Sequence, residues 1–205
     1  MVSNVETKTN LSELILKLLE EKNYPELKEL LVEMNPADIS SIFEEIANEK
    51  IPLLFRLLPK VLAAETFVEM EADAQELLIT GFSDNELKEV LDELYLDDTV
   101  DIVEEMPANV VKRILLNSDS DTRKMINEIL KYPDDSAGSI MTIEYVSLRP
   151  GMTVEEAIKR IRRTGIDKET IYTCYVTDDN RFLQGSVTIK SLLLAEETEE
   201  IAEKI

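Results

Sequence analysis

Residues Lys131 to Gly165 read KYPDDSAGSIMTIEYVSLRPGMTVEEAIKRIRRTG and mark a change of architecture within the chain. Tyr132 to Asp135 should end a helix, because proline disfavours the helical conformation of the residue before it. Ser136 to Ser139 is a run of small residues at which one backbone can approach another closely. Thr142 to Leu148 alternates between polar and apolar residues, as a strand does. The stretch therefore predicts a change from helices to a mixed α and β structure.

A helix and two more strands are predicted to follow. Thr153 and Glu156 have the spacing of a capping box, in which threonine accepts from the third helical amide and glutamate reaches back. Thr170 to Val176 is rich in β-branched and aromatic residues, which favours a buried strand. Turn residues come next, and Phe182 to Val187 is expected to form another strand.

The end of the chain is predicted to be helical. Thr188 can cap a helix that carries Leu192 to Leu194, and the acidic tail from Glu196 to Ile205 is expected to start one more helix. The C-terminal part therefore reads as strand, helix, strand, strand, helix.

Residues 10–130 read as many short helices. Asn10 can cap the first of them, and the polar residues 1–8 are expected to lie outside it. Tyr24 and Pro25 should end this helix. Apolar stripes of two or three turns then recur, each behind a polar or proline start, at residues 39–46, 87–94, 102–106 and 110–115. Helices this short cannot bury their apolar faces alone, so we expect them to stack into a superhelix.

The composition limits which ligands the chain can bind. Its 205 residues include 43 acidic and 22 basic side chains, so the formal net charge is −21. Such a charge attracts cations and repels nucleic acid and anionic membrane surfaces, so we expect no nucleic-acid partner. Histidine is absent, which removes the commonest transition-metal ligand and general base. The single cysteine, Cys174, lies in an apolar strand and cannot form a disulfide within one chain.

We expect the chain itself to be soluble and cytoplasmic. Its N-terminus is polar and shows no signal peptide. The most apolar run, residues 51–64, is interrupted by Arg56 and Lys60 and is too short to cross a bilayer. The lack of a disulfide framework fits a reducing compartment.

The C-terminal elements resemble a CBS domain, with Gly185-Ser186-Val187-Thr188 at the last strand–helix junction. Tyr132 to Arg162 is similar to the segment that joins the helical domain to the first CBS repeat in MgtE-type magnesium channels. The helical part resembles the N-terminal superhelix of the same family, including Ala63-Ala64-Glu65 and the residues from Leu96 to Asp101. The resemblance implies a mainly α superhelix of short helices, followed by a small α+β domain of the CBS type.

The resemblance covers essentially the whole chain and implies two domains. The superhelix would occupy residues 1–131, and the first CBS repeat residues 132–205. CBS repeats normally come in pairs, and neither a second repeat nor the family's transmembrane pore is in this sequence. We therefore expect a fragment of a longer channel, located on the cytoplasmic side of the cell membrane, with the pore and second repeat as partners. A single repeat leaves an apolar face uncovered, so we expect a homodimer through the CBS half.

Two carboxylates are placed to share one ion. Asp97 and Asp101 are four residues apart and so lie on one helical face, whereas Asp98 is offset around the helix. Mg²⁺ prefers oxygen ligands in octahedral geometry and usually takes one or two carboxylates directly, keeping several waters. Acidic residues in a first helical turn are also stabilised by the helix dipole, with or without a metal. The spacing alone leaves both interpretations open.

The resemblance implies specific Mg²⁺ ligands. In the family, the glutamate of the Ala-Ala-Glu segment and the outer aspartates of Asp-Asp-x-x-Asp bind regulatory Mg²⁺, which implies Glu65, Asp97 and Asp101 here. A peptide carbonyl near Ser139 is implied as a further ligand. The main partner carboxylates in the family lie on the second CBS repeat. The implied function is a cytosolic Mg²⁺ sensor, in which ions at the interface between the two domains favour the closed pore.

Other functions are open as well. CBS domains often bind adenine nucleotides, but the aspartate that the family places three residues after the junction threonine is Ser191 here, which weakens that interpretation. The alternative to the sensor is a stand-alone CBS-containing regulator or scaffold that binds an adenine nucleotide or a protein partner. An enzyme is the least supported class, because the sequence shows no histidine, no phosphate-binding glycine loop and no nucleophile with a recognisable base.

Overall fold

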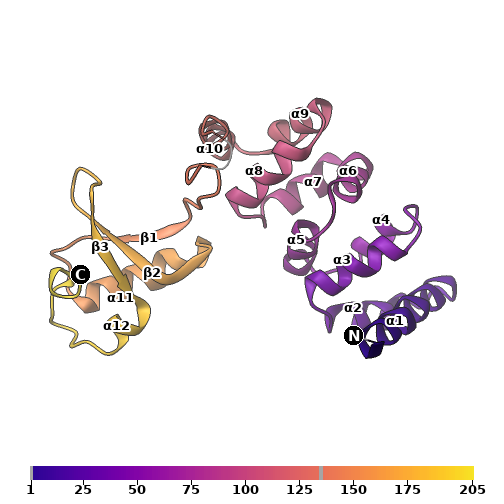
Figure 1. The fold of residues 1–205 in the computed structure, drawn as a ribbon, viewed down its shortest axis with the longest axis horizontal. Helices are drawn as coiled ribbons and strands as arrows, with labels where there is room; N and C mark the ends of the chain where they lie inside the picture. The colour runs from indigo at the N-terminus through magenta and orange to yellow at the C-terminus, as the bar shows by residue number, and fades with distance from the viewer. Residues whose placement is uncertain (1, 134–135) are drawn as a thin grey trace. The chain divides into compact units, whose positions relative to one another are not determined.

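The computed structural model describes residues 2–133 and 136–205, and the chain folds into two compact units (Figure 1). The first unit comprises Met1–Leu94 and Asp98–Pro133. The second comprises Tyr95–Asp97 and Asp134–Ile205. The two units differ in architecture, as the sequence predicted, because one is helical and the other contains a sheet.

The first unit consists of short α-helices. In chain order they are α1 (Val2–Glu20), α2 (Tyr24–Val32), α3 (Pro36–Glu45), α4 (Ile51–Phe55), α5 (Lys60–Val68), α6 (Ala72–Gly81), α7 (Asp84–Leu91), α8 (Leu96–Glu105), α9 (Ala108–Asn117) and α10 (Ser120–Ile129). Polar caps start several of them. Asn35 accepts from the Asp38 amide at 2.9 Å, and Ser83 forms a capping box with Glu86. Each cap satisfies amides that have no partner within the helix.

Both ends of the helical unit differ from the sequence prediction. Helix α1 begins at Val2 rather than after Asn10. The residues before Asn10 include no proline or glycine, so nothing in them prevents the helix from extending. Helix α10 ends at Ile129, before the stop predicted at Tyr132 to Asp135. Asp134 and Asp135 lie outside the described residues.

The helices of the first unit stack on near neighbours in the sequence. Contacts join α1 to α3, α3 to α5, α5 to α7 and α7 to α9, and they also join α4 to α6 and α6 to α9. Each helix buries an apolar stripe, such as Ile39, Ile42 and Phe43 of α3, which are at most 1% exposed. The predicted stacking of short helices is therefore confirmed.

Arg113 of α9 joins three elements of this stack. Its guanidinium donates to the carbonyl oxygens of Ile79 and Phe82 at the end of α6, the latter at 2.5 Å. It also donates to the Asp84 carboxylate, at the start of α7, at 3.0 Å. Carbonyl groups at a helix end have no partner within the helix, so this arginine satisfies acceptors that the α6–α7 turn leaves open.

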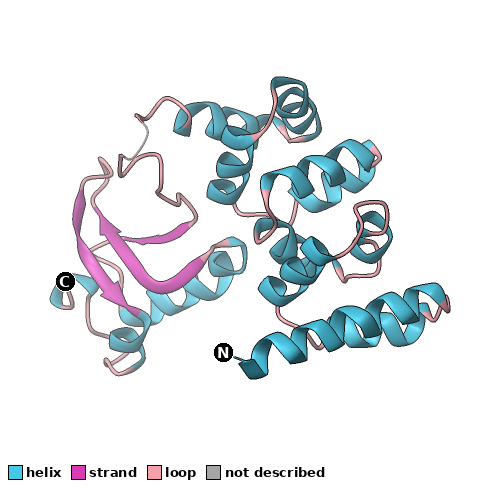
Figure 2. Cartoon of the chain, turned by 45° about the vertical axis from the view of Figure 1, so that its right-hand side comes forward, coloured by secondary structure: helices cyan, strands magenta, loops and turns pink. Residues whose placement is uncertain are grey.

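The second unit is built on a three-stranded sheet with the order β1 (Tyr145–Leu148), β2 (Thr170–Thr177) and β3 (Leu183–Thr188) (Figure 2). Strands β1 and β2 are parallel and are connected through α11 (Val154–Thr164) and the 3₁₀ turn Gly165–Asp167. Strands β2 and β3 are antiparallel, and α12 (Ile189–Leu193) follows β3. The predicted element order is confirmed. So is the fold class, a mainly α superhelix of short helices followed by a small α+β domain.

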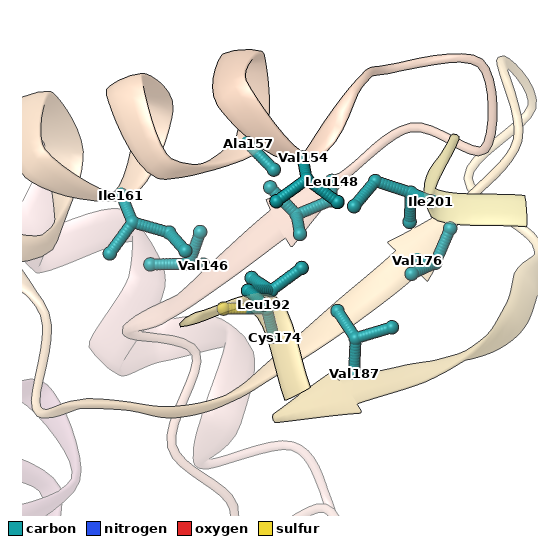
Figure 3. Packing of buried hydrophobic residues seen from close by; sticks show 10 residues of the cluster. All are labelled: Val146, Leu148, Val154, Ala157, Ile161, Cys174, Val176, Val187, Leu192 and Ile201. Carbon is teal, nitrogen blue, oxygen red and sulfur yellow. The ribbon is translucent and has the colours of Figure 1, made fainter. Parts of the chain in front are cut away.

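One apolar cluster forms the core of the second unit (Figure 3). Its members come from all three strands, both helices and the tail: Val146, Leu148, Val154, Ala157, Ile161, Cys174, Val176, Val187, Leu192 and Ile201. Cys174 is a free, fully buried cysteine, and burial raises the pKa of its thiol. It is therefore a core residue, as the sequence predicted.

The acidic tail does not form the helix that the sequence predicted. It runs beside the start of α11, where the Val154 amide donates to the Glu199 carbonyl and the Ile201 amide donates to the Met152 carbonyl, both at 2.9 Å. Its one helical element is the 3₁₀ turn Ile201–Glu203. Ile201 is fully buried in the core cluster, and this packing, together with the backbone bonds, fixes the tail as turns and a short 3₁₀ turn in place of an α-helix.

Two tyrosines lie on the sheet face opposite the core cluster. Tyr145 and Tyr175 alternate with the buried Val146 and Cys174 along their strands, so their side chains point the other way. Their rings meet edge to face, with centroids 5.1 Å apart. Both rings are more than a third exposed, so this face is only partly covered in the chain.

Candidate metal-binding site

An acidic hollow lies between the α5–α6 turn, helix α6 and helix α8 of the first unit. Its volume is about 300 Å³. The polar side chains that line it are Glu69, Glu71, Gln75, Asp98, Asp101 and Glu105. Gln75 is buried and donates to the Phe67 carbonyl at 2.8 Å, which fixes α6 against the end of α5. The other five polar side chains are carboxylates, so the hollow concentrates negative charge and attracts cations.

Helix α8 supplies three of these carboxylates through its periodicity. Asp98, Asp101 and Glu105 are three and four residues apart, so they follow one another along one helical face. Val100 and Val103 are buried and orient the helix. The hollow therefore follows from an amphipathic helix whose polar side is almost wholly acidic, packed near a turn that carries two glutamates.

Asp97 lies in the first turn of α8, outside the lining of the hollow. It belongs to the second unit, as does Glu144. The Leu96 amide donates to the Glu144 carboxylate at 2.9 Å, so this glutamate accepts from the start of α8. Burial raises the pKa of Glu144, the bond from Leu96 opposes this effect, and the charge of Asp97 reinforces it. Asp97 and Glu144 thus form a second, smaller concentration of negative charge.

The other two predicted ligands lie in different surroundings. Glu65 is exposed on α5 between the buried Ala64 and Thr66, and it does not line the hollow. Ser139 lies in a turn, where its amide and hydroxyl donate to the Ser136 carbonyl at 3.1 and 2.9 Å. Both donors of Ser139 are used inside the turn, and its hydroxyl and carbonyl oxygens carry the lone pairs that a cation would need.

The acidic hollow is not a closed coordination sphere. Across residues 11–133, 136–166 and 168–205, no three side chains of the metal-ligating types converge closely enough to hold an ion. Mg²⁺ can still bind in such a region, because it keeps several waters and takes only one or two carboxylates directly. The structure therefore brings Asp101 together with Asp98 and three glutamates, as a surface that a hydrated divalent cation would suit.

Comparisons with known proteins cover nearly the whole chain. The family model for the MgtE intracellular N domain matches residues 34–135, and the model for the CBS domain matches residues 137–197. A solved structure described as the cytosolic domain of the Mg²⁺ channel MgtE in complex with ATP is 33% identical, with a TM-score of 0.86 over 94% of this chain and 79% of that one.

The chain belongs to the MgtE family. The resemblance seen in the sequence is therefore confirmed. The crystal structure of the soluble part of a magnesium transporter, which is 24% identical with a TM-score of 0.81, has the same fold. The magnesium transporter MgtE of Thermus thermophilus is 34% identical over 189 residues, which are 90% of this chain and 42% of that transporter. The chain thus spans less than half the length of this relative. Among the described residues, no helix is both long and apolar enough to span a membrane.

The junction that resembles a nucleotide-binding CBS motif is used for helix capping. Thr188 accepts from the Ser191 amide at 3.1 Å, and the Ser191 hydroxyl donates back to the Thr188 carbonyl at 2.8 Å. Ser191 offers a hydroxyl, not a carboxylate, at the position where the family pattern places an aspartate. The predicted cap is confirmed, and it accounts for both residues without a ligand.

Sequence reasoning missed four of the five carboxylates in the acidic hollow. It set Asp98 aside as offset from Asp101, although a spacing of three residues also places two side chains on one helical face. It did not single out Glu69, Glu71 or Glu105. Spacing could have added Glu105, which lies four residues after Asp101. Glu69 and Glu71 come from another repeat, and only the stacking of helices brings them to α8.

Proposed function

We propose that this chain is the cytosolic Mg²⁺-sensing region of an MgtE-type magnesium transporter, in which bound Mg²⁺ favours the closed pore. The observation that carries the proposal is the row of carboxylates on α8, from Asp98 to Glu105, opposite Glu69 and Glu71. Membership of a magnesium transporter family supports Mg²⁺ as the cation for this acidic surface. The role would be regulatory and not catalytic.

The proposed ligands are Glu65, Asp97, Asp101 and the peptide carbonyl near Ser139, and of these only Asp101 lines the acidic hollow. Each is an oxygen donor, which is the ligand type that Mg²⁺ prefers. Waters would complete the coordination, as would carboxylates of a second CBS repeat in the longer protein. Because these sites would be incomplete in this chain, we expect it to bind Mg²⁺ weakly.

The mechanism follows from charge. Acidic surfaces repel one another unless counter-ions lie between them, so without Mg²⁺ the region is expected to be more open. An ion that bridges carboxylates of the helical domain and oxygens of the CBS domain would favour a compact state. A ligand shifts such an equilibrium only by its difference in affinity for the two states, and the compact state would offer more converging oxygens. The cytosolic Mg²⁺ concentration would thereby control how often the pore is closed.

The proposal includes an assembly. We place the helical domain at residues 1–131 and the CBS repeat at residues 132–205, close to where the two family models meet. The CBS half would form a homodimer, and the transmembrane pore and second CBS repeat would be partners in the longer protein. Support for the dimer comes from the exposed apolar side chains Phe182, Leu193 and Leu194, each at least 65% exposed. Light scattering should give the mass of a dimer, and a monomer at high concentration would contradict this part.

Limited proteolysis tests the Mg²⁺ proposal. We expect Mg²⁺ to slow tryptic cleavage of the 205-residue chain as its concentration rises from micromolar to millimolar. Asp97→Ala combined with Asp101→Ala should raise the midpoint about tenfold, equivalent to about 1.4 kcal/mol of binding free energy. Glu29→Ala combined with Glu33→Ala is the control, because it removes the same charge from two exposed residues that are four apart at the C-terminal end of α2.

The control pair should leave the midpoint unchanged. Circular dichroism at equal helix content would show that neither double variant has lost its fold. If Mg²⁺ protects the Asp97 and Asp101 variant as well as the natural chain, the proposed ligands are wrong. If Mg²⁺ protects neither, the sensing function itself is contradicted for this region.

A regulator that binds an adenine nucleotide is the second candidate function. It is favoured by one finding, the ATP bound in the related cytosolic domain. The local capping by Thr188 and Ser191 argues against a ribose contact at this junction. ATP without Mg²⁺ in the same proteolysis experiment separates the two, because protection by the nucleotide alone would favour this candidate. Protection by neither ligand would favour a scaffold that binds a protein partner.

A further inference from the structure

The C-terminal end of α11 carries a concentration of positive charge that the Mg²⁺ proposal does not use. Residues 159–168 read KRIRRTGIDK, with five basic residues and one acidic residue in a chain of net charge −21. Lys159 is paired with Glu155 of the same helix at 2.7 Å. Of the arginines, Arg160 is half-buried, whereas Arg162 and Arg163 are exposed.

These arginines differ from others in the chain in their surroundings. Arg56 and Arg113 pair with carboxylates at 2.7 and 3.0 Å. Arg162 and Arg163 make no ion pair with any carboxylate among residues whose side chains the structure describes. The helix dipole favours cations in a last turn, but this effect is small at an exposed site and is screened by salt. It explains why cations are tolerated here, and it does not explain why so many are gathered.

The fold places this charge on one surface. Helix α11 buries Val154, Ala157 and Ile161 in the core cluster, so its basic residues lie on the opposite face. A shallow hollow of about 420 Å³ runs along that face and is lined by Met152, Glu156, Lys159, Arg160 and Arg163.

An apolar residue adjoins the cations. Ile166, in the 3₁₀ turn that follows α11, is 84% exposed. No residue among the large exposed apolar side chains of the described residues is more exposed. Burying a side chain of this size removes a substantial apolar area from water, which is favourable. An exposed apolar residue beside cations is therefore typical of a surface that binds a membrane.

We propose that Lys159, Arg160, Arg162, Arg163 and Ile166, here called the basic tip, bind the surface of a bilayer that contains anionic phospholipids. Guanidinium groups form paired hydrogen bonds with phosphate oxygens, which suits lipid headgroups. Ile166 would enter the interfacial region beneath the headgroups. Basic residues near an anionic leaflet each contribute to binding, and together with an apolar anchor they make contact reversible but specific for charge.

The net charge of the chain does not prevent this contact. Electrostatic interactions decay over about 8 Å at physiological ionic strength, so only charges close to the membrane act on it. The basic tip brings cations to that surface, while the acidic hollow belongs to the other unit. Because the chain belongs to a transporter family, a membrane surface would be close to it. The inference goes beyond Mg²⁺ sensing and does not depend on it.

Vesicle co-sedimentation of the 205-residue chain tests the proposal. Vesicles of phosphatidylcholine alone are compared with vesicles that contain phosphatidylglycerol, at physiological ionic strength and with EDTA, so that Mg²⁺ cannot bridge carboxylates to lipid phosphates. We expect binding only to the anionic vesicles. Arg162→Gln combined with Arg163→Gln should lower the partition coefficient about 25-fold, since each cation at such a surface contributes about fivefold. Ile166→Ser should lower it by a smaller factor.

The matched control is Lys124→Gln combined with Lys131→Gln, which removes the same charge from exposed positions of α10 and just after it. It should change the partition coefficient less than about twofold. Equal losses in the two double variants, or binding to neutral vesicles alone or to none, would overturn the proposal. If millimolar inorganic phosphate at constant ionic strength abolishes vesicle binding, the basic tip binds a free anion and not lipid. If the arginine variant has a lower molecular mass and still binds vesicles, the basic tip binds a second copy of the chain.

Discussion

The two units of the chain are stabilised in different ways. In the first, most of the contacts join helices that are one or two steps apart in the sequence, so the apolar contacts are spread along a stack. In the second, residues from three strands, two helices and the tail meet in one cluster. Because the stability of a stack is not concentrated in any single layer, acidic residues can lie along its whole length without disrupting one shared core. A small sheet unit depends on every member of its core.

Charge divides between the units as well. The greater part of the net charge of −21 comes from residues 1–133, and the acidic hollow lies there. The second unit contains the basic run at residues 159–168. The helical unit would therefore attract cations, and the basic tip of the sheet unit would attract anions.

The largest expected effect comes from making the same core truncation in each unit. Leu192 and Leu87 are both fully buried, so each change to alanine should cost about 2–5 kcal/mol of unfolding free energy. Leu192→Ala should unfold the second unit as a whole, and amide protection should fall in β1, β2 and β3 together. Leu87→Ala should reduce protection in α7 and its neighbours α5 and α9, and leave α1 and α2 nearly unchanged. Hydrogen exchange measures both patterns.

Leu183→Ala is the control for the first of these variants. It removes the same atoms from a residue of β3 that is 64% exposed, and should cost less than about 0.5 kcal/mol. If Leu87→Ala unfolds the entire first unit at once, the contrast between a distributed stack and a single core is not valid.

A smaller effect is expected from Arg113→Ala, which tests how one polar side chain holds the stack. Loss of its bonds to two carbonyl groups and the Asp84 carboxylate should cost about 2 kcal/mol, because hydrogen bonds that involve a charged group contribute about 1.5–3 kcal/mol. Arg113→Lys should recover less than half of this loss, since lysine keeps the charge but not the planar fork. Chemical denaturation gives the values. The neighbouring variant Lys112→Ala should be neutral, and an equal loss there would remove the assignment to Arg113.

The smallest effect is a contrast in pH dependence between Glu86 and Glu144. The hydrogen bond from Arg56, with those from Ser83, lowers the pKa of Glu86 from 4.5 to about 2. Its contribution to stability is thus full above pH 4.5 and is lost as the pH falls from there to about 2. Solvent screening limits it to a few tenths of a kcal/mol, because both partners are more than a third exposed.

Burial acts on Glu144 in the opposite direction and raises its pKa. Its contribution is therefore present below pH 4.5 and is lost as the pH rises through the raised pKa. Glu86→Gln should slightly lower stability at neutral pH and leave it unchanged in strong acid. Glu144→Gln, which keeps an oxygen for the Leu96 amide, should not lower stability at neutral pH. Thermal unfolding across this pH range measures both, and a loss of stability from Glu144→Gln at neutral pH would contradict the burial argument.

Local signals in the sequence predicted much of the fold. The predicted capping box at Thr153 and the predicted cap at Thr188 are both present, because each depends on residues within one turn. Alternation of residues likewise indicated the first strand, and β-branched and aromatic composition indicated the second. Three predictions failed: helix α1 begins at Val2, helix α10 ends at Ile129, and the tail forms no α-helix. The tail could not be predicted from local signals, because Ile201 packs into a core formed by distant residues.

The candidate site could be predicted only in part, for a similar reason. Asp97 and Asp101 were recognised from spacing within one helix and from family resemblance. Glu69 and Glu71 reach the hollow through the stacking of α5, α6 and α8, which spacing along the sequence does not encode. Whether Glu65, Asp97, Asp101 and Ser139 bind Mg²⁺ stays a prediction.

Small-angle X-ray scattering of the chain, with millimolar Mg²⁺ and with EDTA, tests the central claim most directly. If divalent cations neutralise the acidic surfaces and favour a compact state, the radius of gyration should fall in Mg²⁺. Asp97→Ala combined with Asp101→Ala should reduce that change, and an equal ionic strength of NaCl should not produce it. Scattering curves that superimpose with and without Mg²⁺ would contradict the account.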